Sequence, residues 1–195
     1  MPHLIVVIGI PGAGKSFFAH QFADMFHAPL LSEEVIVRSL SAESTLESRT
    51  SASNVLQALL PEFLKTGKTV LLDGSGAMRV ERSEIIRAAK AAGYQPLFVW
   101  LQIDTPTAKM RSLKPARGTD KQPLTSDEFD TQLKKFSQPH PSEPYIVLSG
   151  KHTYAAQAKI LLRKLSAPRA AQTVAPTAPP QAPKRPSTGN RISIS

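Results

Sequence analysis

Residues 9–16 read Gly-Ile-Pro-Gly-Ala-Gly-Lys-Ser and constrain the fold more than any other part of the sequence. They match the pattern G-x-x-x-x-G-K-[S/T], in which a glycine-rich turn cradles phosphate groups. The preceding run, Leu4 to Ile8, has the length and β-branched content of a buried strand. Four apolar side chains follow at the spacing of one helix face: Phe18, Phe22, Met25 and Phe26. We therefore predict a strand, a loop and a helix in the order that this pattern requires.

The residue types in this stretch suit phosphate binding. Glycine adopts backbone conformations closed to other residues and lets a ligand approach closely. Amide groups of the loop and the first helical turn then point at phosphate oxygens, and the helix dipole adds to the attraction. We predict that Lys15 reaches the β- and γ-phosphates and that the Ser16 hydroxyl ligates Mg²⁺. The predicted nucleotide-binding residues are Gly9, Pro11, Gly12, Ala13, Gly14, Lys15, Ser16 and Phe17.

Cysteine is absent from all 195 residues, which excludes disulfides, thiolate zinc sites and cysteine nucleophiles. No apolar run approaches the roughly 20 residues of a membrane span. The first apolar run is short and leads straight into the glycine-rich stretch, unlike a signal peptide. We therefore expect a cytoplasmic protein without a membrane partner.

The formal net charge of +9 is unevenly placed along the chain. The last acidic residue is Glu143, and from Ser166 onward four basic residues stand among Pro, Ala, Thr, Ser and Gln. A segment of that composition cannot bury a core. We therefore predict one domain over residues 1–165 and a disordered basic tail over 166–195. The excess charge is compatible with nucleic acid as a partner, and equally with a nucleotide-binding enzyme.

Apolar runs and amphipathic segments alternate after the first helix. Further strands are predicted over 28–31, 69–73, 96–103 and 145–148, with helical periodicity between them. Residues 41–53 are rich in serine and threonine and are expected to form a loop, with a helix beginning at Asn54. Strands that alternate with helices predict an α/β fold of three layers, in which helices cover both faces of a parallel sheet.

Charged side chains follow the second and third predicted strands. The second strand runs into Ser32, Glu33 and Glu34, and Arg38 follows shortly after. Either glutamate suits a base that takes the proton of an attacking hydroxyl, and both equally suit a helix start, where the dipole favours acids. Asp73 ends the third strand and has three open roles: holding Mg²⁺, binding an acceptor, or capping the next turn.

Two groups of cations come later in the chain. Arg79 and Arg82 open a helix at its N-terminus, where the dipole disfavours cations, so we predict acceptor binding by one of them. Five cations then surround Gly118: Lys109, Arg111, Lys114, Arg117 and Lys121. Such a segment suits a basic lid that folds over a nucleotide and neutralises charge on the γ-phosphoryl group. The alternative is a solvated basic loop.

Together, residues 9–16, the Leu-Leu-Asp-Gly sequence at 71–74 and the segment from Arg111 to Thr119 resemble the P-loop kinases of the polynucleotide kinase type. These belong to the nucleoside-monophosphate-kinase-like group, small kinases with an AAA-type ATP-binding domain. The resemblance covers residues 3–165. It implies a P-loop NTPase fold with a five-stranded parallel sheet and a basic lid.

The resemblance also implies phosphoryl transfer from ATP, with Mg²⁺, to an acceptor hydroxyl. By motif position it assigns Lys15, Arg111 and Arg117 to catalysis, and Ser16 and Asp73 to the metal. In the family an aspartate after the second strand, with an arginine three residues on, is the base and acceptor anchor. The nearest match is Glu34, with Arg38 four residues on. Together with Arg79 and Arg82, predicted from their position, the acceptor-side residues are Glu33, Arg38 and Asp73.

Two functions follow as hypotheses. The first is an ATP-dependent kinase that phosphorylates a hydroxyl of a small molecule or of a nucleic-acid 5′ end. The second is a nucleotide-dependent switch or binding module that hydrolyses ATP slowly and engages a partner through its tail. ATP is favoured over GTP because the sequence has no guanine-reading N-K-x-D stretch.

Overall fold

A computed structural model describes residues 1–40, 46–114 and 123–167. Strands and helices alternate along these residues. They are β1 (His3–Ile8), α1 (Lys15–Phe26), β2 (Leu30–Ser32), α2 (Glu33–Leu40), α3 (Leu46–Leu64), β3 (Val70–Asp73), α4 (Arg79–Ala91), β4 (Gln95–Gln102), α5 (Thr105–Ser112), α6 (Ser126–Lys135), β5 (Tyr145–Ser149) and α7 (Tyr154–Ser166). The predicted alternation is therefore confirmed.

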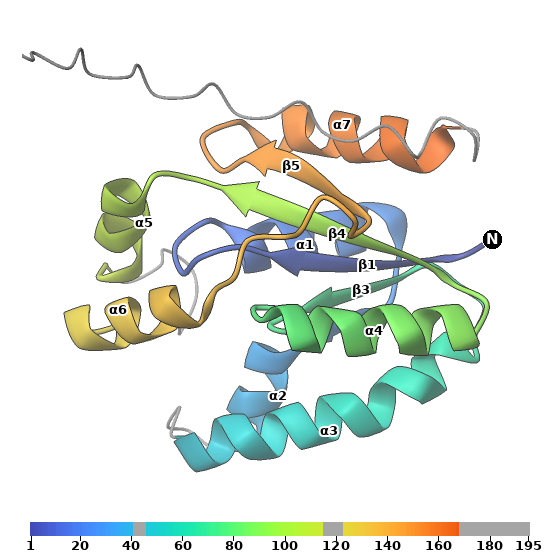
Figure 1. Cartoon of the computed structure of the whole chain (residues 1–195), viewed down its shortest axis with the longest axis horizontal. Coiled ribbons are helices and arrows are strands. Elements are labelled where there is room, and N and C mark those ends of the chain that lie inside the picture. Colours follow the sequence, from blue (N-terminus) through green and yellow to red (C-terminus); the bar gives the residue numbers. More distant parts are fainter. Residues whose placement is uncertain (41–45, 115–122, 168–195) are drawn as a thin grey trace, which may run out of the picture.

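The strands form one five-stranded sheet in the order β2-β3-β1-β4-β5, and every neighbouring pair is parallel. The central strand β1 therefore has β3 on one side and β4 on the other. All strands end at the same edge, towards which the arrows in Figure 1 point and where α5 and α6 lie. Residues that follow different strands are thereby brought together at this edge, as in other open α/β sheets.

Helices cover both faces of the sheet because side chains alternate along each strand. Ile5, Val7 and Leu71 face the layer that contains α1 and α7. Leu4, Val6 and Leu72 face the opposite layer, formed by α3 and α4. Figure 1 shows α3 and α4 together on one side of the strands and α7 on the other. The predicted three-layer α/β fold is confirmed.

The prediction of a loop over residues 41–53 is wrong from Leu46 onward. Helix α3 begins there rather than at Asn54 and runs to Leu64 through Pro61. Ala52 and Ser48 are buried in this added part of the helix. Serine and threonine weaken a helix only modestly, so packing against α2 and the sheet decides the outcome.

Two other expectations lie outside the described residues. These are the core of the basic lid, with Arg117 and Lys121, and the tail after Ala167. Within the described ranges, no helix is both long enough and apolar enough to cross a membrane.

Three neighbouring backbones approach the glycine-rich loop of residues 9–14. A Cβ atom on Gly9 would lie 2.5 Å from the Leu101 carbonyl oxygen of β4. One on Gly12, which has a φ of 75°, would lie 2.2 Å from the Ala108 carbonyl oxygen of α5. From the turn after β5, a Cβ on Gly150 would lie 2.8 Å from the Ala13 carbonyl oxygen. The loop is thus fixed from the sides of β4, α5 and β5, and only glycine permits these distances.

Arg82 of α4 is fully buried, and its guanidinium is saturated by hydrogen bonds. Nε and Nη2 donate to the Glu143 carboxylate at 2.8 and 3.2 Å. Nη1 donates to the carbonyl oxygens of Gly76 and Ser137 at 3.1 and 2.9 Å. The side chain therefore ties the turn after β3 to the segment before β5. The predicted acceptor contact of Arg82 is wrong, because its donors are used within the protein.

We predict that Arg82→Met lowers the free energy of unfolding by about 3–5 kcal/mol, because Glu143 would keep a buried charge without its partner. Urea unfolding of the purified protein measures this. Lys65→Met is the matched control, since it breaks the exposed Lys65–Glu62 ion pair and should cost less than about 1 kcal/mol. Equal losses in the two variants would contradict a structural role for Arg82.

We also predict that Gly12→Ala destabilises the protein at least twice as much as Gly67→Ala. Both glycines have positive φ, 75° and 67°, so alanine strains each backbone by about 1–2 kcal/mol. Only at Gly12 does the new methyl group also meet a backbone, whereas nothing lies within 4 Å at Gly67. Thermal unfolding of the two variants compares them directly. Equal unfolding midpoints in the two variants would show that α5 can move away from Gly12 at no cost.

Candidate nucleotide and phosphoryl-transfer site

The loop of residues 9–16 has the geometry of an anion site. Gly14, with a φ of 96°, precedes the first residue of α1, and in the described part of the chain no side chain caps this helix start. The first turn of α1 carries no acid. The Lys15 ammonium donates to the Ile10 carbonyl oxygen at 3.0 Å, which keeps it beside the loop. Amide groups and one cation therefore gather at a helix N-terminus, where the dipole favours phosphate.

Asp73 lies in the strand next to this loop. It is opposite Val7 of β1 and Ser32 of β2 in the sheet register. Its side chain shares the face of Leu71, two residues earlier, which packs with Phe18 and the rest of α1. Asp73 therefore points to the α1 side of the sheet, the same side as Ser16.

The Asp73 carboxylate fits a metal ligand. The residue is 2% exposed, and its Oδ1 atom has no hydrogen-bond partner among the described residues. Such a buried, unsatisfied carboxylate oxygen is costly unless something binds it. The described residues hold no cluster of three or more metal-ligating side chains. A single carboxylate such as Asp73 suits Mg²⁺, which binds through one or two protein groups and completes its shell with phosphates and water.

Glu33 begins α2 directly after β2, and its side chain lies over the turn after β3. A Cβ on Gly74 would be 2.8 Å from Glu33 Oε2, so Gly74 makes room for this carboxylate. Burial raises the pKa of Glu33 above its ordinary value, and the positive charge of Arg49 opposes this shift. Three neighbouring carboxylates add to the rise in pKa: Asp73, Glu81 and Glu34. Glu33 thus keeps more affinity for a proton than an exposed glutamate.

The turn at residues 74–76 is held from α4. Glu81 accepts hydrogen bonds from the amides of Gly76 and Met78 at 3.0 and 3.3 Å. Arg82 holds the Gly76 carbonyl oxygen from the other side. The turn that packs against Glu33 is therefore fixed by two side chains of one helix.

Glu34 and the predicted arginines occupy different positions around this turn. Glu34 is ion-paired with Arg38 one helical turn on, at 3.5 Å. Arg79 is exposed at the start of α4. Arg49 of α3 was not singled out in the sequence, yet its charge acts on both Glu33 and Glu128 of α6. It was missed because residues 41–53 were expected to be a loop, which leaves no basis for placing a side chain.

Arg111 lies on the opposite side of the loop, towards β5. Its Nη1 atom donates to the Gly150 carbonyl oxygen at 3.0 Å, and Gly150 itself touches Ala13 of the loop. Lys109 is paired with Asp130 of α6 at 2.8 Å. Of the five cations in the predicted lid, Arg111 thus contacts the turn after β5, and Lys109 joins α5 to α6.

The arrangement can support phosphoryl transfer. Phosphate-binding amides, a lysine and a metal-fitting aspartate lie along the edge formed by β1 and β3. A carboxylate with a raised pKa stands at the end of β2, where it can accept a proton. These are the parts that position and neutralise a transferring phosphoryl group.

Solved structures share this fold. A sugar kinase from a Janibacter species superposes with a TM-score of 0.62 at 18% identity, over 85% of this chain and 95% of that one. A gluconokinase from Sinorhizobium meliloti gives 0.59 at 21% identity, over 84% and 95%. Kti12 from Chaetomium thermophilum, solved with ADP-AlF3, gives 0.61 at 19% identity, over 82% and 96%. At such identities the similarity shows the fold, that of the small P-loop kinases.

Sequence comparison gives the family. A search of curated proteins found no significant match. The family model described as an AAA domain matches residues 4–139, which include the glycine-rich loop, Glu33, Asp73 and Arg111. With more than half of the chain matched, the protein belongs to this AAA domain family.

Proposed function

We propose that the protein is an ATP-dependent phosphotransferase that moves the γ-phosphoryl group to an acceptor hydroxyl. The observation that carries this proposal is the position of Glu33. Its half-buried carboxylate stands at the end of β2, two strands from the phosphate-binding loop, with the Asp73 carboxylate between them on β3. A switch that only hydrolyses nucleotide does not need a second carboxylate with a raised pKa on the acceptor side.

The proposed step needs no covalent enzyme intermediate. The acceptor oxygen attacks the γ-phosphorus, an O–P bond forms, and the bond to the β,γ-bridging oxygen breaks, which leaves ADP. The acceptor proton passes to a Glu33 carboxylate oxygen. We assign this role to Glu33 rather than Glu34, because Glu34 is ion-paired with Arg38. Catalysis consists of positioning and charge neutralisation, and Lys15 supplies a cation beside the transferring group.

The metal would be held by the Ser16 hydroxyl and the Asp73 carboxylate. When bound, Mg²⁺ neutralises charge on the phosphate oxygens. Arg117, by its motif position, and Arg111 would add positive charge from the lid; Arg111 must first leave the Gly150 carbonyl oxygen. Arg49, whose charge acts on Glu33, is a candidate contact for the acceptor, together with Arg38 of α2 and the exposed Arg79 of α4.

A second candidate is slow ATP hydrolysis that drives a conformational switch. The similarity to Kti12, which was solved with ADP-AlF3, is compatible with it. ADP with a trifluoride resembles a transferring phosphoryl group, which occurs both in hydrolysis and in transfer. An assay for transfer of the labelled γ-phosphate to an acceptor separates the two candidates.

We predict Lys15-dependent labelling of an acceptor when γ-labelled ATP and Mg²⁺ are supplied with a panel of sugars, nucleosides, small alcohols and 5′-hydroxyl oligonucleotides. Lys15→Ala should lower transfer by about 10²–10³-fold, the usual cost of one preorganised charge. The exposed Lys65→Ala is the matched control and should leave transfer unchanged. ADP and free phosphate as the sole products across the panel would instead favour the switch.

We predict that transfer falls as the pH falls through the raised pKa of Glu33, because the base must be ionised. The acidic limb in the dependence of kcat on pH should therefore lie at a higher pH than the ordinary pKa of a glutamate would give. Arg49→Gln should move the limb to still higher pH, since it removes the cation that opposes the shift. Glu33→Gln should lower kcat by about 10²–10⁴-fold and abolish the limb.

Arg87→Gln, on the exposed side of α4, is the matched control for Arg49→Gln. It should leave the acidic limb where it is. A limb that stays in place in Glu33→Gln would assign the base to another group.

A further inference from the structure

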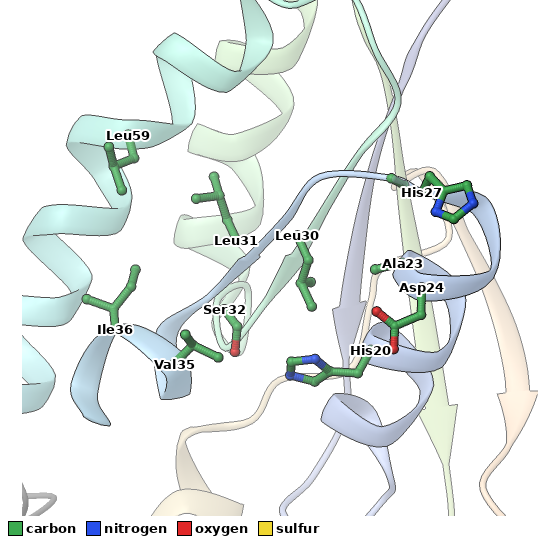
Figure 2. A pocket seen from close by; sticks show the side chains of 11 residues that line it. His20, Ala23, Asp24, His27, Leu30, Leu31, Ser32, Val35, Ile36 and Leu59 are labelled. Carbon is green, nitrogen blue, oxygen red and sulfur yellow. The ribbon is translucent and has the colours of Figure 1, made fainter. Parts of the chain in front are cut away.

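A pocket of about 470 Å³ lies beside the edge strand β2, apart from the glycine-rich loop (Figure 2). Helix α1 supplies a polar wall with His20, Asp24 and His27. The facing wall is apolar and includes Val35 of α2 and Leu59 of α3. Its size is that of a pocket for a small ligand. One wall can thus hydrogen-bond to a ligand, while the other excludes water.

Ser32 lines this pocket, and its buried hydroxyl is available to hydrogen-bond with a ligand. The residue is 3% exposed, and its Oγ atom has no hydrogen-bond partner among the described residues. In the view of Figure 2 the hydroxyl points into the space between Val35 and His20. A buried hydroxyl without a partner is costly, and native proteins rarely keep one without a reason. A ligand with a hydrogen-bonding group would satisfy it.

Ser32 is the lining residue that lies next to the proposed transfer site. This residue is opposite Asp73 in the β2–β3 register, so both side chains emerge on the same face. Asp73 Oδ1 also has no partner within the described residues. On α1, His20 lies one helical turn after Ser16. A molecule in this pocket thus has one end beside the residues that we assign to the metal and the phosphates.

The walls determine which chemistry fits. A sugar or a nucleotide chain would lay hydroxyls or phosphates against Val35, Leu59 and Leu30, where they lose water without gaining partners. An anionic ligand would also meet Asp24 in the wall of the pocket and would lie near Asp73, the register partner of Ser32. A neutral or cationic molecule with an aliphatic or aromatic body avoids both costs.

We propose that this pocket binds the apolar body of the acceptor, which makes the substrate a small amphipathic alcohol rather than a nucleic-acid 5′ end or a sugar. The inference rests on the proposed function. The alcohol oxygen, next to Ser32 and Asp73, takes the γ-phosphoryl group of ATP, its proton passes to Glu33, and ADP leaves.

The test uses 2-phenylethanol as the probe, with glycerol and 5′-hydroxyl dithymidine as comparisons. Ligand-observed NMR measures binding to the full-length protein, and γ-labelled ATP measures transfer in the same samples. Leu59→Gln should weaken 2-phenylethanol binding at least fivefold and leave the KM for ATP unchanged. Ile160→Gln is the matched control, since Ile160 of α7 is 41% exposed and Leu59 is 38% exposed. It should change neither quantity.

Ser32→Ala separates a ligand-binding hydroxyl from a structural one. It should raise the melting temperature by about 2–4 °C, because an unsatisfied buried hydroxyl is removed. It should at the same time weaken 2-phenylethanol binding about two- to tenfold, the effect of one hydrogen bond. A fall in melting temperature with unchanged binding would overturn the assignment.

The outcomes keep the two proposals apart. Lys15-dependent labelling of 2-phenylethanol that weakens in Leu59→Gln supports both. Lys15-dependent labelling of glycerol or dithymidine alone, unaffected by Leu59→Gln, overturns the pocket as acceptor site and leaves the kinase in place. No Lys15-dependent labelling of any compound, with 2-phenylethanol still bound, overturns the acceptor assignment together with the proposed function.

Discussion

The structure depends on close backbone contacts around the glycine-rich loop. Leu101 of β4 and Ala108 of α5 each bring a carbonyl oxygen into space that a Cβ on Gly9 or Gly12 would fill. Gly150, after β5, comes equally close to Ala13. The loop follows the central strand β1. All three contacts come from the side of β1 where β4 and β5 lie. The carboxylates of Asp73 and Glu33 lie on the β3 side, so in the proposed function the acceptor binds on the other side of the loop from these contacts.

The turn after β3 and the start of α4 are held by charged side chains. The buried Arg82–Glu143 pair and the carbonyl oxygens around it connect the start of α4 to the segment before β5. Glu81 fixes the turn at residues 74–76, and that turn packs against Glu33. A buried ion pair is costly to form and costlier to break, so it fixes geometry more than it adds stability. The raised pKa of Glu33 is a consequence of this arrangement, since burial and nearby carboxylates act only when they are held in place.

The predictions from sequence succeeded where local pattern and long-range packing agree. The strand, loop and helix around residues 9–16 follow from short-range spacing. Asp73 was singled out because it ends an apolar strand, and the structure shows that its Oδ1 atom is buried without a partner among the described residues. Arg82 failed for the opposite reason: its partners are as many as 61 residues away in the chain, so its position at a helix start gave no sign of burial. Arg49 was missed because its serine- and threonine-rich segment was expected to be a loop. Packing against α2 makes this segment helical.

The sequence by itself determined the chemistry that the chain can hold. The residue types of the glycine-rich loop are readable without a structure, because each is required by backbone geometry or by phosphate charge. Tertiary structure decided which other groups meet that loop. It placed Glu33 over Gly74, turned Arg82 inward, set Arg111 against Gly150, and opened a pocket at Ser32. These relations join residues on different strands and helices, and their energies come from burial and from charges brought together only when the sheet is complete.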